Sequence, residues 1–135
     1  MHLKFIAFIL FLTSLSACQL ISPIFVEYNG VRRDVAEWIN KQSLLNMQQK
    51  RSLAQLSKAQ QKLVNIDHLS SDLKLSIAKE NSIAIHCAHL HVSDKKIAQL
   101  QNQVFANPNE QNRILKKYDQ EFPKFRLDPK KIQCE

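Results

Sequence analysis

Glycine is almost absent from this chain: Gly30 is the single glycine among 135 residues. A glycine-rich phosphate-binding loop is therefore excluded, because such a loop needs several glycines whose backbone approaches the phosphate closely. The GxSxG turn of serine hydrolases and the HExxH motif of zinc proteases are missing as well. We therefore expect a protein that is not an enzyme and that acts by binding.

Proline is also scarce, with four in the chain, and Pro108, Pro123 and Pro129 all come late. So few breakers between residues 31 and 107 predict long helices and not a many-stranded sheet. Apolar residues at helical spacing predict a first helix from Val31 to about Val64.

Capping residues divide the rest of the chain into further helices. Residues 65–71 are typical of a turn, with Ser70 or Ser71 as the N-cap of a helix that carries Leu73, Ile77, Ala84, Cys87 and His91. The alternation in residues 83–92 leaves a strand open as the alternative. Ser93 and Asp94 begin another helix, whose apolar face holds Ile97, Leu100 and Val104.

The late prolines define the C-terminal part. Asn107-Pro108-Asn109 ends the preceding helix, a last helix runs from about Asn109 to Phe122, and the residues after Pro123 are extended. We therefore predict an all-α fold, a small antiparallel bundle of three to four helices with an extended C-terminal tail, as a single domain over residues 31–135.

The first 18 residues have the pattern of an export signal. His2 and Lys4 precede an apolar run over residues 5–12, followed by small and polar residues to Ala17. The apolar run is much shorter than the roughly 20 residues that cross a bilayer. The alternative to a lipoprotein signal is an ordinary secretory signal that is cleaved after Ala17.

Leu15-Ser16-Ala17-Cys18 resembles the lipobox of bacterial lipoproteins. The resemblance implies a signal peptide over residues 1–17 and a lipidated tether over 18–30. Cys18 would carry a diacylglycerol and an N-acyl chain such as palmitate, and we expect no other cofactor. Gln19, in place of an aspartate, favours the periplasmic face of the outer membrane.

The chain has 19 basic against 12 acidic side chains; removing the signal with its Lys4 leaves 18 against 12, a net charge of +6. We expect the membrane as a partner through the anchor, together with anionic envelope components such as lipid, lipopolysaccharide or peptidoglycan, or a periplasmic protein. Export excludes nucleic acid. The alternative is that the lysines are simply a solvated surface, since they are spread as doublets at 95–96, 116–117 and 130–131.

Three cysteines are present, and lipidation of Cys18 leaves Cys87 and Cys134. An even pair in an oxidising compartment predicts a disulfide. This bond would tie the end of the tail to the middle of the chain and stabilise the domain by roughly 3–4 kcal/mol.

His86, His89 and His91 flank Cys87 and are the candidates for a metal site. On a helix His86 and His89 lie one turn apart, as do Cys87 and His91, so either pair can offer two ligands to zinc or copper. A structural zinc needs four ligands, and disulfide formation would remove the Cys87 thiolate. The alternative is therefore that these histidines are ordinary side chains of a helix.

The segment Leu56-Ser57-Lys58-Ala59-Gln60 is similar to the LTxxQ motif of small helical periplasmic stress chaperones. That resemblance implies a client-binding cradle or a stress-response accessory role. It covers five residues and has serine in place of threonine. The favoured interpretation remains a membrane-anchored lipoprotein with a non-catalytic helical binding domain.

Overall fold

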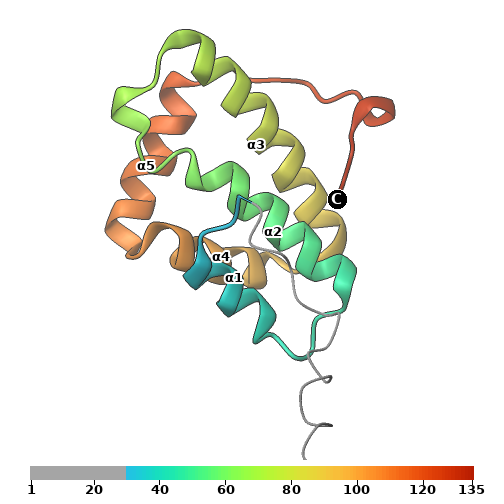
Figure 1. Ribbon diagram of the computed structural model, residues 1–135. Helices are drawn as coiled ribbons and strands as arrows, with labels where there is room; N and C mark the ends of the chain where they lie inside the picture. Colours follow the sequence, from blue (N-terminus) through green and yellow to red (C-terminus); the bar gives the residue numbers. More distant parts are fainter. Residues whose placement is uncertain (1–29) are drawn as a thin grey trace, which may run out of the picture.

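The computed structural model describes residues 30–135, so the signal segment, Cys18 and most of the tether lie outside the described residues. Within 30–135 the fold is all-α, which confirms the predicted class (Figure 1). The helices are α1 (Arg33–Asn40), α2 (Met47–Gln61), α3 (Ser71–His91), α4 (Asp94–Phe105) and α5 (Pro108–Glu121), with short 3-10 helices η1 (Ile66–His68) and η2 (Pro129–Lys131). None of the described helices is both long and apolar enough to cross a membrane.

The prediction of one helix from Val31 to about Val64 is wrong, because the chain turns between α1 and α2. Asn46 caps α2: its side chain accepts from the Gln49 N–H at 2.9 Å, and the Gln49 side chain accepts from the Asn46 N–H at 3.0 Å. Lys50 then donates to the Asn40 carbonyl at the end of α1, at 3.0 Å. A capping box and a buried lysine thus fix the turn.

The central helix of the bundle is α2, which packs against α1, α3 and α4. Leu53 and Leu56 are fully buried in the core. Small residues alternate with them, and the buried ones are Ser52, Ala54, Ser57 and Ala59. Their small volume lets three neighbouring helices approach the same short helix.

The later helices begin at or within one residue of the predicted positions. Ser70, and not Ser71, is the N-cap of α3, Ser93 is that of α4, and Asn107 is that of α5 with Pro108 as the first helical residue. Because α3 continues to His91, the alternative of a strand over residues 83–92 is excluded. The predicted apolar face of α4 is confirmed, since Ile97, Leu100 and Val104 are buried.

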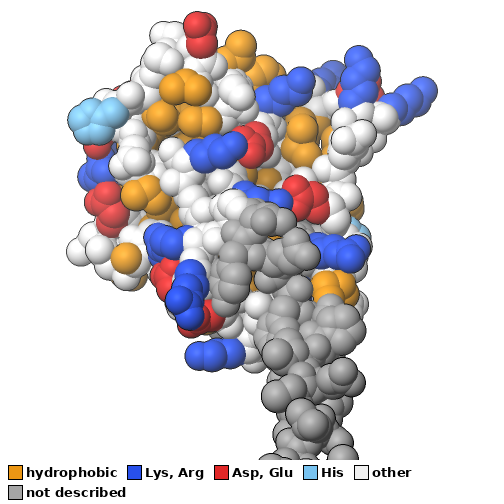
Figure 2. All heavy atoms as spheres, viewed as in Figure 1, with side chains coloured by type: hydrophobic (Ala, Val, Ile, Leu, Met, Phe, Trp, Pro, Cys, Tyr) orange, Lys and Arg blue, Asp and Glu red, His pale blue; other side chains and the backbone are white. Residues whose placement is uncertain are grey.

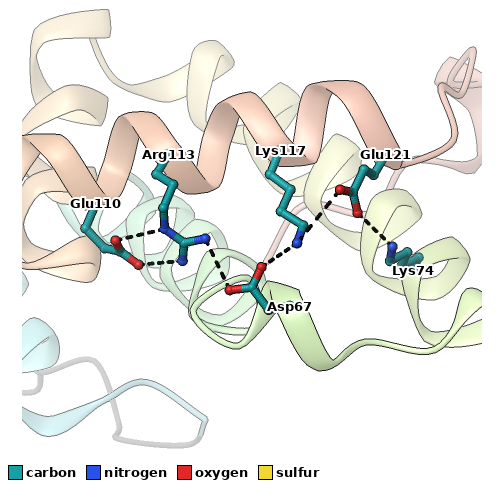
Figure 3. A network of polar contacts seen from close by, with 6 residues as sticks. All are labelled: Asp67, Lys74, Glu110, Arg113, Lys117 and Glu121. Carbon is teal, nitrogen blue, oxygen red and sulfur yellow. Dashed lines mark hydrogen bonds and ion pairs between the residues drawn. The ribbon is translucent and has the colours of Figure 1, made fainter.

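A network of charged side chains joins α5 to η1 and α3 (Figure 3). Asp67 of η1 accepts hydrogen bonds from Lys117 and, at 3.2 Å, from Arg113 of α5. Glu121 pairs with Lys74 of α3 at 2.9 Å. Ile114 is the only buried residue within α5 itself, so these exposed pairs supplement a small apolar contact.

The pKa of Asp67 is held below its ordinary value by the hydrogen bond from Lys117 and by the charges of Lys117 and Arg113. Because the unfolded state then binds the proton more tightly, the stabilisation is present above the ordinary aspartate pKa of about 3.9 and is lost as the pH falls through the lowered folded value. We therefore predict that Asp67→Asn lowers stability at neutral pH and has little effect in acid.

Urea titrations of the wild type and Asp67→Asn at about pH 7 and about pH 2 measure this difference. Asp119→Asn, which removes an exposed carboxylate of α5 outside the network, is the control. A stability difference that is the same at both pH values would contradict the role assigned to the network.

Candidate functional site

The C-terminal tail, residues 123–135, forms a strap that leaves the end of α5 and arches beside α3 (Figure 1). It is extended as predicted, apart from the turn of η2. The predicted disulfide is present: Cys134 of the strap is bonded to Cys87 of α3, with the Cα atoms 5.5 Å apart. Cys87 is fully buried, so the bond attaches the strap to the core.

The end of the strap also lies on α2, where glutamine side chains bond to its backbone. Gln55 donates to the Gln133 carbonyl at 3.1 Å and accepts from the Glu135 N–H at 3.3 Å. Gln48 donates to the Glu135 carbonyl at 2.9 Å, and Lys58 pairs with the Glu135 carboxylate at 2.5 Å. This face of α2 thus holds the strap in position through hydrogen bonds to the main chain of the strap and an ion pair with Glu135.

Two hollows lie between the strap and the bundle. The first, the polar groove, has a volume of about 440 Å³ and is lined by Gln55, Lys58, Glu80, Gln133 and Glu135. The second, the apolar groove, has a volume of about 300 Å³ and is lined by Phe125, Arg126, Leu127, Asp128 and Ile132. Lys79, Ile83 and Lys131 line both grooves, which together form the strap site.

The carboxylates of the strap site are compensated by nearby cations. Glu80 is bonded to Lys62 at 2.6 Å, Glu135 to Lys58, and Asp128 lies 3.9 Å from Lys131. Lys79 and Arg126, in contrast, have no carboxylate partner among residues 30–135. Basic side chains gather on the projecting turn of the strap, next to hydrophobic ones (upper right of Figure 2).

The histidine candidates lie near the C-terminal end of α3, with His89 exposed and His86 and His91 half-buried. His89 Nδ1 is 3.0 Å from Asp94 Oδ1. The disulfide removes the thiolate of Cys87 as a ligand. In the part of the chain that the structure describes, no three histidine, cysteine or carboxylate side chains come together as a metal site.

The chaperone-like segment lies inside the bundle. Leu56 and Ser57 are fully buried and Gln60 is nearly so, which leaves these side chains out of reach of a client. Lys58 is partly exposed, but its ammonium group is bonded to Glu135 of the strap. The motif therefore contributes to packing and to strap attachment in this structure.

Sequence reasoning identified the disulfide but missed the strap site. The signal that was available is the alternation of Lys124, Phe125, Arg126 and Leu127, which gives an extended segment one apolar and one basic edge. That Lys79 of α3 faces the strap could not be predicted, because the spacing of the apolar residues does not determine how α3 packs against the strap.

Two cationic groups without carboxylate partners among residues 30–135 lie beside the concave surface of the strap site, an arrangement that would attract an anion. The size of the site falls at the lower end of the range for small-molecule sites, about 300–1,000 Å³. Comparison with protein-family models, with curated proteins and with solved structures finds no match to this chain.

Loss of the disulfide is predicted to destabilise the domain strongly. The bonded residues are 47 positions apart, and loop-closure entropy for that length corresponds to about 4 kcal/mol. We expect Cys134→Ala to lower the free energy of unfolding by about this amount in urea titrations. Reductant should destabilise the wild type equally and leave the variant unchanged; a wild type that is insensitive to reductant would refute the prediction.

Proposed function

We propose that this chain is a lipid-anchored protein of the bacterial envelope whose helical domain binds an anionic envelope component without catalysing a reaction. The observation that carries the proposal is the strap site, where Lys79 and Arg126 lack carboxylate partners beside two grooves. An anion placed there would gain charge-assisted hydrogen bonds without having to displace an existing ion pair.

The proposed location rests on the lipobox resemblance at residues 15–18, with Cys18 as the lipidated residue, and on the disulfide. A bonded pair of cysteines is typical of proteins that fold in an oxidising compartment. The bond between Cys87 and Cys134 therefore supports export. Together with Gln19, these features favour the periplasmic face of the outer membrane.

The anchor and the basic surface would act together in this location. Lipid chains keep the domain within reach of anionic head groups, and each lysine near such a surface contributes about 1 kcal/mol of attraction. The attraction decays over a Debye length of about 8 Å at physiological salt, so only groups close to the membrane take part. Binding is therefore expected to depend strongly on salt.

The anchor is tested by the intact mass of the protein from a bacterial membrane fraction, alkylated without reductant. We predict a chain from Cys18 to Glu135 that carries lipid and no alkyl adduct, because Cys87 and Cys134 are bonded to each other. Cys18→Ser should abolish lipidation. A processed wild-type chain without lipid would exclude the anchor.

Anion binding is tested by co-sedimentation of the chain from Gln19 onward, which retains all of the described residues 30–135, with vesicles. We predict binding to phosphatidylcholine vesicles that contain phosphatidylglycerol and none to phosphatidylcholine alone. Charge reversal by Lys79→Glu removes one attraction and adds one repulsion, about 2 kcal/mol in total, which is a loss of roughly 30-fold in affinity.

The matched control is Lys95→Glu, which changes the net charge equally at an exposed position of α4 that lines neither groove. An equal loss of affinity in both variants would show that binding depends on the overall charge of the chain and not on the strap site. Failure of the wild type to bind the anionic vesicles would overturn the proposal.

A further inference from the structure

We infer that the strap site holds a single anionic amphiphile, with its apolar chain in the apolar groove and its head group between Lys79 and Lys131. This inference rests on the proposed function, since it names the class of anion that the domain binds. It is carried by the arrangement of apolar and cationic side chains on the two facing walls of the site.

The wall formed by α3 offers one cation and one apolar side chain. Lys79 and Ile83 are four residues apart on the helix, so they lie on the same face one turn from each other. Both line both grooves. A ligand lying along this wall thus meets an ammonium group and an apolar surface within a single helical turn.

The wall formed by the strap also carries both cationic and apolar side chains. Lys131 and Ile132 are neighbours there, and Phe125 and Leu127 extend the apolar surface with Arg126 between them. Phe125 remains 37% exposed, so part of its ring is accessible to an apolar group of a ligand. Both walls therefore pair an apolar surface with a cation.

Charge selects an anionic ligand over a neutral one. The carboxylates that face the site are those of Glu80, Asp128 and Glu135, and each has a cation nearby. The contact of Asp128 with Lys131 is long, at 3.9 Å, and the lysine side chain is 85% exposed, so this ion pair contributes little. Lys131 is thus able to turn towards a ligand head group.

The apolar groove selects an amphiphile over a bare anion. A phosphate or acetate ion would satisfy the cations but would leave Phe125 and Ile132 in water. An alkyl chain covers them, and the burial of its methylene groups favours binding. The adjoining polar groove has room for the polar remainder of a head group.

The test is calorimetric titration of the chain from Gln19 onward with laurate below its micelle concentration, after circular dichroism has shown that the chain is helical. We expect one laurate per chain. Acetate lacks the apolar chain and dodecyl maltoside lacks the negative charge, so each should bind at least about tenfold more weakly than laurate. Phe125→Ser and Lys79→Gln should each weaken laurate by about tenfold.

The matched controls are Leu73→Ser, which replaces an exposed leucine of α3 outside the strap site, and Lys95→Gln on α4. Both should bind laurate like the wild type. Loss in the controls equal to that in Phe125→Ser and Lys79→Gln would overturn the assignment to the strap site, as would equal binding of acetate.

Failure of the inference is distinguishable from failure of the proposed function. If anionic vesicles are bound in a manner that depends on Lys79 while laurate is not bound, the domain recognises a charged surface and the amphiphile site is refuted. If neither is bound, both the proposed function and this inference fall.

Discussion

The positions of α1, α3 and α4 depend on their packing against α2, a helix that is largely enclosed although it carries many polar side chains. Several of its glutamines offset part of the cost of this burial by hydrogen bonding to the backbone of other segments. Gln49 donates to the His91 carbonyl at the end of α3, and Gln55 binds the strap. Gln61 donates to the Gly30 carbonyl at 2.8 Å and accepts from the Arg32 N–H at 2.7 Å. The glutamine-rich stretch is therefore the scaffold of the domain.

Features set by local chemistry were predictable from the sequence, and features set by packing were not. Ser70 and Ser93 marked helix starts because a capping side chain acts on backbone only two or three residues away. Asn107 was predicted only to end α4, although it also caps α5. The break after Asn40 was missed because apolar residues continue at helical spacing across it. Recognising Asn46 and Gln49 as a capping box would have revealed it.

The candidate site was harder to predict than the fold. Cys87 and Cys134 could be paired by counting, but the pairing alone does not say which side chains of α3 face the strap. Lys79 and Lys131 are far apart in the sequence and meet at one site only because α3 and the strap lie side by side. The overall positive charge was equally uninformative, since Lys74, Arg113 and Lys117 are engaged in joining α5 to the bundle.

The position of the disulfide in the sequence also determines when it can form during synthesis and export of the chain. Cys134 lies downstream of all the described helices, so the bond to Cys87 cannot close until α5 and the strap have emerged. In an exported chain that crosses the membrane with its N-terminus leading, oxidation would be the final event of maturation. Cys87 would then stay without this partner until almost the whole of residues 30–135 had emerged.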